Sequence, residues 1–283
     1  MRTTGIVVGT DGTTTSDAAV EWAAREAHRR GLTLRVVHAF DWDWRESRFP
    51  VGEHHLDAAR RQAEDVVAAA VDRVRRVAPG LTPQTFTLIG PAVPRLLESA
   101  RGAQLLVLGR RGRGGFTGML LGSTAQRVAT HAPCPVIVIG EQPAPDAPIA
   151  AGVDDSPSAD LVLETVFGTA ADQNCPITVI RACPPALPAW LTTDPPARDD
   201  GELDRLEEQL APWRAKFPDV PVQVALTHDT PPAALIAASH RARLIVVGSH
   251  GHGRVSGSLV GSTSLQLLHH AACPVHIART TPE

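Results

Sequence analysis

"LGRRGRGGFTGMLLGST" (Leu108–Thr124) and "VGSHGHGRVSGSLVGST" (Val247–Thr263) are two stretches of one chain that share a pattern of glycines. Each stretch ends in Gly-Ser-Thr. The matching glycines are Gly109/Gly248, Gly112/Gly251, Gly114/Gly253, Gly118/Gly257 and Gly122/Gly261. A turn needs one or two glycines, so a longer matched series favours a loop whose main chain closely approaches a ligand.

The repeat extends well beyond these two stretches. "IVVGTDGTTTSDAAVEWAAREA" (Ile6–Ala27) aligns with Ile149–Ala170, and "HAPCPVIVI" (His131–Ile139) aligns with "HAACPVHIA" (His270–Ala278). Between the copies lies the Pro-rich segment "GEQPAPDAP". We therefore predict two copies of one domain, residues 1–140 and 149–283, joined by a semi-rigid linker at residues 141–148.

Each copy alternates short β-branched runs with longer helical patterns. In the first copy we predict strands at Gly5–Gly9, Thr33–Ala39, Gln84–Leu88, Leu105–Gly109 and Pro135–Ile139, and helices at Ser16–Arg30, Leu56–Val77, Val93–Arg101 and Thr124–His131. In the second copy we predict strands at Ile149–Val153, Ile177–Ala182, Val222–Leu226, Leu244–Gly248 and Pro274–Ala278. "LLVLG" and "LIVVG" are apolar without alternation, as in strands covered on both faces. The predicted fold is α/β: two tandem copies of a five-stranded, doubly wound parallel sheet.

Composition excludes several classes of protein. The 283 residues are 43% hydrophobic and 20% charged with a net charge of −3, which argues against a disordered chain and against a nucleic-acid partner. No apolar run approaches the length of a membrane span, and the N-terminus lacks a secretory pattern, so we expect a cytoplasmic protein without membrane contact. Lys216 is the only lysine and lies in "WRAKFPD". A Walker A loop and a protein kinase each need a lysine in another context, so both are excluded.

The glycine stretches run from the end of the fourth predicted strand of each copy to the start of a helix. Open α/β sheets bind ligands at that edge. The first amides of the helices at Gly122-Ser123-Thr124 and Gly261-Ser262-Thr263 lack internal partners and form a ready anion site. One alternative stays open: the glycines only make turns, and Ser123 and Ser262 are plain N-caps.

The spacing G-x-x-G, nine residues, G-[ST] after an apolar strand resembles the universal stress protein family. Gly109–Gly112 with Gly122-Ser123 fits it, as does Gly248–Gly251 with Gly261-Ser262. The first-strand turns, "GTDG" and "GVDD", and the closing "HAPCPV" and "HAACPV" also match, so the resemblance covers nearly the whole chain twice. It implies a tandem protein of the ATP-binding branch, with an adenine nucleotide α-hydrolase-like fold and ATP, with or without Mg2+, as ligand.

The resemblance also implies the residues that contact the nucleotide. Asp11 and Asp154 would contact the ribose hydroxyls, the main chain at Ala39 and Ala182 would recognise the adenine edge, and the glycine loops would hold ribose and phosphates. The implied residues of the first copy are Gly9, Asp11, Ala39, Gly109, Gly112, Arg113, Gly114, Gly122, Ser123 and Thr124. Those of the second copy are Gly152, Asp154, Ala182, Gly248, Gly251, His252, Gly253, Gly261, Ser262 and Thr263.

One departure from the family pattern and two alternative interpretations accompany this assignment. Asp11 could instead serve as a helix cap for Thr14 or Thr15. Asp155 stands where the family has a glycine, and a further carboxylate near a polyphosphate is unfavourable, so we expect the affinity or metal requirement of the second copy to differ. His250 and His252 could be read as metal ligands, but without a third ligand nearby they are better read as donors beside phosphates, and we expect no protein-bound metal.

No G-x-S-x-G, H-E-x-x-H or C-x-x-C pattern occurs, so we expect a binding protein without catalytic residues. The expected function is a nucleotide-dependent regulator of stress response or dormancy that acts on an unknown protein partner. Two alternatives stay open: a weak ATPase or autophosphorylating protein, and a nucleotide-free interaction protein. The resemblance further implies that Pro135–Ile139 and Pro274–Ala278 pair within one chain, and that the protein forms a homodimer.

Overall fold

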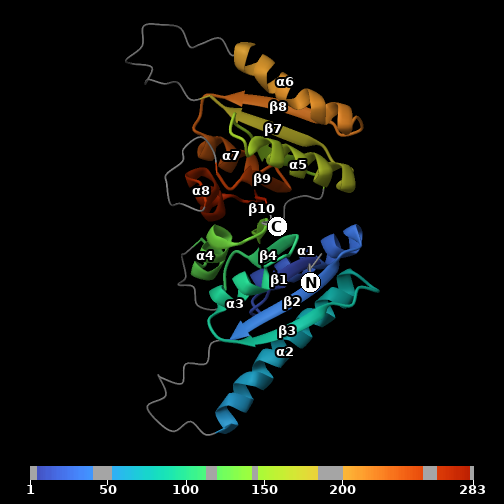
Figure 1. Cartoon of the computed structure of the whole chain (residues 1–283), viewed down its shortest axis with the longest axis vertical. Coiled ribbons are helices and arrows are strands. Elements are labelled where there is room, and N and C mark those ends of the chain that lie inside the picture. The colour runs from blue at the N-terminus through green and yellow to red at the C-terminus, as the bar shows by residue number, and fades with distance from the viewer. Residues whose placement is uncertain are drawn as a thin grey trace. The chain divides into compact units, whose positions relative to one another are not determined.

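A computed structural model of the chain describes residues 5–40, 53–112, 120–141, 146–183, 200–250 and 260–280. The chain divides into two compact units, with the boundary between Gly140 and Glu141. Within the described residues each unit contains five strands and four helices in alternation (Figure 1). Each unit is therefore considered by itself.

The elements of the first unit are β1 (Gly5–Gly9), α1 (Thr14–Arg30), β2 (Thr33–Phe40), α2 (Glu53–Val77), β3 (Gln84–Ile89), α3 (Ala92–Ser99), β4 (Leu105–Gly109), α4 (Ser123–His131) and β5 (Val136–Ile139). Those of the second are β6 (Ile149–Gly152), α5 (Ala159–Gln173), β7 (Ile177–Ala182), α6 (Asp200–Lys216), β8 (Val222–Thr227), α7 (Pro231–Ser239), β9 (Leu244–Gly248), α8 (Ser262–His270) and β10 (Val275–Ala278).

The strands of each unit pair in parallel and in the same order. The first unit has the order β3-β2-β1-β4-β5 and the second β8-β7-β6-β9-β10. The predicted fold class, two tandem doubly wound parallel sheets, is confirmed. The chain runs from β1 through β2 to β3 at one edge of the sheet and then returns to β4, which pairs with the opposite side of β1. This reversal of strand order opens a crevice at the carboxyl ends of β1 and β4. The equivalent position in the second unit lies at β6 and β9.

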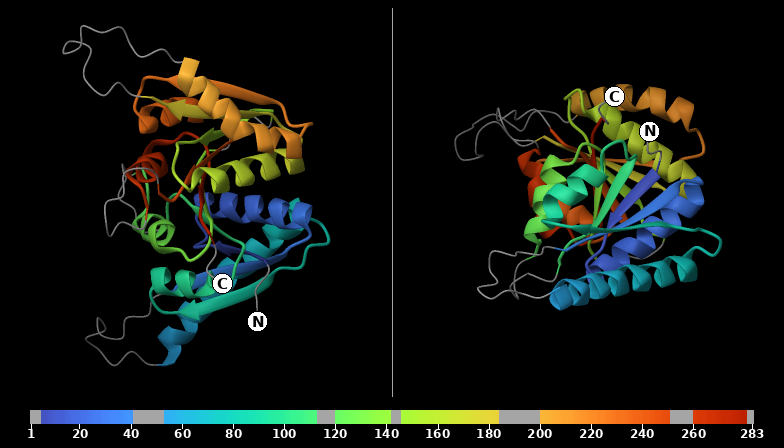
Figure 2. Two further views of the ribbon diagram at one scale, coloured as in Figure 1. Left: turned by 45° about the horizontal axis from the view of Figure 1, so that its top comes forward. Right: turned by 60° about the horizontal axis from the view of Figure 1, so that its bottom comes forward.

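Helices cover both faces of each sheet (Figure 2). In the first unit α1 and α2 pack together, and α3 and α4 pack together; in the second the pairs are α5 with α6 and α7 with α8. Right-handed crossovers that run in opposite directions along a sheet place their helices on opposite faces. The central strands are therefore buried on both sides: four of the five residues of β4 are buried, as are four of the five of β9.

The two units fill equivalent cores with different side chains. Along α1 the fully buried positions Ala19, Ala23 and Ala27 bring the helix close to the sheet. Along α5 the fully buried Phe167 stacks on Trp213 of α6, with 6.2 Å between ring centroids. Alanines in one unit and aromatic side chains in the other thus fill the core beside equivalent helices. This is possible because close packing requires that the volume be filled rather than that one particular residue be present.

Several predicted element ends shift by one to three residues. Helix α1 begins at Thr14, two residues before the predicted Ser16, because Thr13 is its N-cap. It ends where Gly31 adopts a φ of 62°, a conformation that suits glycine. Helix α4 begins at Ser123 rather than Thr124, with Gly122 as its N-cap. The shift at α4 matters most, because it decides which groups face the crevice.

Candidate functional site

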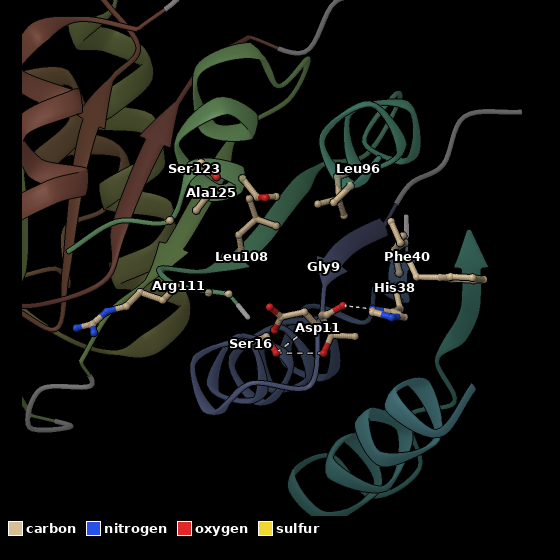
Figure 3. A pocket seen from close by; sticks show the side chains of 18 residues that line it. Gly9, Asp11, Ser16, His38, Phe40, Leu96, Leu108, Arg111, Ser123 and Ala125 are labelled. Atoms are coloured by element: carbon tan, nitrogen blue, oxygen red, sulfur yellow. Dashed lines mark hydrogen bonds between the residues drawn. The ribbon is translucent and has the colours of Figure 1, made fainter. Parts of the chain in front are cut away.

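A pocket of about 550 Å3 opens at the carboxyl ends of β1, β2 and β4 (Figure 3). Its apolar end lies against α3, where Leu96 is joined by Leu108 of β4 and Val37 of β2. Its polar end lies between the turn after β1 and the start of α4, where Asp11 and Ser123 line it. The predicted site residues that line this pocket are Gly9, Asp11, Ala39, Gly109, Gly112, Gly122, Ser123 and Thr124.

A smaller pocket, of about 300 Å3, occupies the equivalent place in the second unit. Its apolar end includes Leu235 of α7 and Val247 of β9. The predicted site residues that line it are Gly152, Asp154, Ala182, Gly248, Gly261, Ser262 and Thr263. The remaining predicted residues, Arg113, Gly114, Gly251, His252 and Gly253, lie outside the described residues. Every predicted site residue that the structure describes therefore lines one of two equivalent pockets.

The carboxylate after the first strand is held by the turn that it follows. Asp11 Oδ1 accepts hydrogen bonds from the amide of Thr13 at 3.1 Å and from its hydroxyl at 2.7 Å. Thr13, in turn, caps α1. The second unit repeats the arrangement, because Asp154 Oδ1 accepts from both the amide of Ser156, at 3.0 Å, and its hydroxyl. Asp11 does not cap Thr14 or Thr15 itself; it orients the residue that caps the helix.

The N-termini of α4 and α8 point open main-chain amides at the pockets. Gly122 and Gly261 are the N-caps, and neither has a side chain that could satisfy the first amides. Ser123 and Ser262 are the first helical residues, so the alternative that they are plain N-caps is wrong. Unpaired amides with a helix dipole worth about +0.5 charge attract anions.

Close main-chain approach explains two of the glycines. A Cβ at Gly112 would lie 2.6 Å from the Oδ2 atom of Asp11, so the loop after β4 passes directly over the carboxylate. A Cβ at Gly109 would lie 2.6 Å from the carbonyl oxygen of Thr15, which is main chain of α1. A side chain at Gly109 would meet the main chain of α1, whereas one at Gly112 would require the Asp11 carboxylate to move.

A buried strand residue holds the turn after the first strand in each unit. His38 of β2 is 5% exposed, and its Nδ1 lies 2.7 Å from the carbonyl oxygen of Thr10. Because a carbonyl oxygen only accepts, Nδ1 carries the proton in this contact. At the equivalent place in β7, the side chain of Arg181 is 5% exposed and bonds Asp155 and Glu202, with 3.1 Å between its Nε and Glu202 Oε2. Sequence reasoning missed both residues, since one buried polar residue in a strand carries no spacing signal.

The ion pair changes the expected role of Asp155. Desolvation by burial lowers the pKa of Arg181, but the hydrogen bond that Arg181 donates to Asp155 and the charges of Asp155 and Glu202 outweigh it and raise that pKa. Asp155 is not among the residues that line the second pocket. Repulsion between its carboxylate and a phosphate, the basis for expecting a different affinity at the second copy, is thus offset by Arg181.

The described residues contain neither a metal-binding cluster nor a membrane-spanning helix. Within the ranges that the structure describes, no three His, Cys, Asp or Glu side chains gather as a metal-binding group. No helix in the same ranges is long and apolar enough to cross a membrane.

Comparisons with known proteins agree with the fold. A sequence model of the universal stress protein family matches residues 3–140 and 147–279. A universal stress protein of Mycobacterium tuberculosis is 35% identical in an alignment of 289 residues covering 97% of this chain and 97% of the relative. The crystal structure of a universal stress protein from Archaeoglobus fulgidus is similar in fold, with a TM-score of 0.73 over 99% of both chains at 19% identity. A universal stress protein solved in complex with cAMP is 27% identical, covers 49% of this chain and 98% of its own, and has a TM-score of 0.39.

Proposed function

The chain belongs to the universal stress protein family, and we propose that each of its two domains binds one molecule of ATP. Nucleotide occupancy would then regulate the contacts of the protein with a partner protein during stress or dormancy. The observation that carries the proposal is the convergence of three features on one pocket in each domain. These are an oriented carboxylate, an open helix N-terminus and an apolar end bounded by strand ends.

Each end of the pocket suits one part of an adenine nucleotide. The apolar end, between Leu96 and Leu108 in the first domain, offers flat contacts to a base, and the main chain at Ala39 offers it hydrogen bonds. Asp11 is placed to accept hydrogen bonds from sugar hydroxyls. The amides and hydroxyls of Ser123 and Thr124 at the start of α4 suit a phosphate chain.

The same residues fit a magnesium nucleotide without a metal site of the protein's own. One carboxylate and four hydroxyl side chains, including those of Ser123 and Thr124, line the first pocket, and Mg2+ commonly binds through few protein ligands together with substrate phosphates. Asp11, Ser123 and Thr124 would face the ion that ATP brings. The ion would reduce the charge of the phosphates beside Asp11.

The described lining supports binding better than turnover. Main-chain amides account for affinity, but they supply neither a general base nor a nucleophile for a chemical step. The carboxylates of Asp11 and Asp154 already accept two hydrogen bonds each from their own turns. We therefore place regulation ahead of hydrolysis, and release of labelled phosphate from γ-labelled ATP well above a blank would favour the weak ATPase instead.

Adjacent carboxylates in the second domain allow a sharp test. Asp154 lines the pocket and Asp155 pairs with Arg181, so Asp154→Ala and Asp155→Ala remove the same charge one residue apart. By isothermal titration with ATP and Mg2+, we expect Asp154→Ala to weaken the second site about tenfold or more, the loss of one charge-assisted hydrogen bond. Asp155→Ala should change the affinity much less. Equal losses in the two variants, or no heat in the parent protein, would contradict the proposed site.

A further inference from the structure

A line of hydroxyl groups joins the first turn of each domain to the loop after its fourth strand. In the first domain Thr13 Oγ1 lies 2.7 Å from Asp11 Oδ1 and 3.2 Å from Thr15 Oγ1. Thr15 Oγ1 then donates to the carbonyl oxygen of Arg111 at 2.5 Å. The line thus begins at the pocket carboxylate and ends on the glycine loop, 96 residues further along the chain from Thr15.

The second domain repeats the line with different residues. Ser156 Oγ donates to Asp154 Oδ1 and lies 2.8 Å from Ser158 Oγ. Ser158 Oγ donates to the carbonyl oxygen of His250 at 2.5 Å. Serines replace threonines, and histidine replaces arginine at the acceptor, yet the contacts are the same. Both domains therefore have a side-chain hydroxyl at each of these two positions.

The count of protons shows what each hydroxyl does. Two hydroxyl protons serve three contacts, and the two outer acceptors, a carboxylate and a carbonyl, cannot donate. When both outer contacts are made, no proton remains for the contact between the hydroxyls. Thr15 and Ser158 are therefore donors dedicated to the loop, while Thr13 and Ser156 serve the carboxylate.

Anchoring the Arg111 carbonyl also orients the next amide. In a planar trans peptide the C=O and the following N–H point in opposite directions, so a carbonyl directed at α1 turns the Gly112 N–H away from α1. The Gly112 nitrogen lies near the start of α4, because a Cβ on Gly122 would lie 3.6 Å from it. The loop amide thereby joins the helix amides at the anion-binding end of the pocket.

We propose that Thr15 and Ser158 are positioning residues that set the loop after the fourth strand for the phosphate chain and leave base and sugar binding unaffected. The inference rests on the proposed nucleotide function. It adds that different residues control the phosphate-binding end of the pocket and the end that binds base and sugar. The hydroxyls act on the phosphate end through Arg111 and His250. Thr15 is not among the residues that line the first pocket, whereas Ser158 lines the second.

The test uses the full chain with Asp154→Ala, so that the first site dominates the signal, and compares Thr15→Val with Thr15→Ser. Thr14→Val is the control, because Thr14 is an exposed neighbour on the same helical turn. By calorimetry with ATP and with adenosine, Thr15→Val should lose about fivefold in ATP affinity, the typical effect of one hydrogen bond. Its adenosine affinity should stay within twofold of the parent. Thr15→Ser should restore ATP binding, and Thr14→Val should not alter it.

Three outcomes would overturn the inference. Unchanged ATP affinity in folded Thr15→Val would show that the hydroxyl does not position the loop. Equal losses for ATP and adenosine would show general damage to the pocket, as would failure of Thr15→Ser to rescue binding. A parent that binds adenosine and ATP as expected separates these failures from the proposed function. A parent that binds neither would overturn the proposed function, and the inference with it.

Discussion

The turn after the first strand is held by a neutral contact in one domain and by an ion pair in the other. In the first domain Gly12, with a φ of 76°, adds no second carboxylate beside Asp11, and His38 donates to the Thr10 carbonyl. In the second domain Asp155 takes the place of Gly12, and Arg181 takes the place of His38. The two exchanges accompany each other, because the new carboxylate faces the new guanidinium. A buried side chain of the second strand thus contacts the turn in both domains, through a carbonyl in one and a carboxylate in the other.

The residues that line the two pockets also differ. Thr10 and Ser16 line the first pocket beside the turn, and Val153 and Ala159 line the second. At the phosphate end Arg111 of the first pocket corresponds to His250 of the second. The first pocket is larger, and its lining includes an arginine where the second has a histidine. The comparison indicates two pockets built on one plan with different side chains at the proposed phosphate end.

The largest expected effect concerns the glycine that ends the fourth strand. A Cβ at Gly109 would meet main-chain atoms of Thr15 at 2.6 Å, whereas a Cβ at Gly248 meets Ser158 Oγ at 2.8 Å. Main chain of a packed helix yields less than a hydroxyl, so Gly109→Ala should cost its domain about 2–3 kcal/mol and Gly248→Ala about 1 kcal/mol. Native-state hydrogen exchange of β4 and β9 amides measures both losses. Equal losses would contradict the difference in close approach.

A smaller effect concerns the ion pair of the second domain. Arg181 is buried but Asp155 is 56% exposed, so solvent screens the pair, and we expect a coupling free energy of about 1 kcal/mol. A double-mutant cycle with Arg181→Met and Asp155→Asn, followed by urea unfolding, measures it. Additive effects of the two substitutions would mean that the pair does not hold the turn. Pairing with Glu202 survives in Asp155→Asn, which keeps Arg181 partnered.

The smallest effect concerns the phosphate end. Exchanging Arg111→His and His250→Arg should lower the preference for ATP over AMP in the first domain and raise it in the second. A charge near the surface contributes about 0.5–1 kcal/mol, or about two- to fivefold in relative affinity. Competition titrations with ATP and AMP on each exchanged variant measure this preference. If neither preference changes, the difference in charge between the pockets has no bearing on ligand choice.

The sequence alone predicted most of the fold and many of the residues that line the two pockets. Main-chain binding needs glycines and a helix start, and both leave a spacing that can be read without a structure, as at Gly109, Gly112 and Gly122. Side-chain pairing leaves no such trace. Arg181 reaches Asp155 across 26 residues because β7 lies beside β6, and only the strand register shows that. For the same reason the contact from Thr15 to Arg111, across a turn and a strand end, could not be predicted.

The cap at α4 shows a second limit. Ser123 has the residue type of an N-cap, yet Gly122 takes that position with a ψ of 146°. The amide of Gly122 donates to the Arg110 carbonyl at 2.8 Å, and this hydrogen bond joins the two ends of the loop. The helix consequently starts at Ser123, one residue before the predicted Thr124. A long-range main-chain contact therefore overrides local cap preference, and this leaves the Ser123 side chain available to the pocket.

The central claim is that each domain holds one ATP at the carboxyl edge of its own sheet. Native mass spectrometry of the full chain, titrated with ATP and Mg2+, counts bound nucleotides directly. At an ATP concentration that just saturates the parent protein, the account predicts two ATP molecules on the parent, mostly one on Asp11→Ala or Asp154→Ala, and mostly none on the double variant. A parent protein that binds no nucleotide, or a folded double variant that still holds two ATP molecules at that concentration, would contradict it.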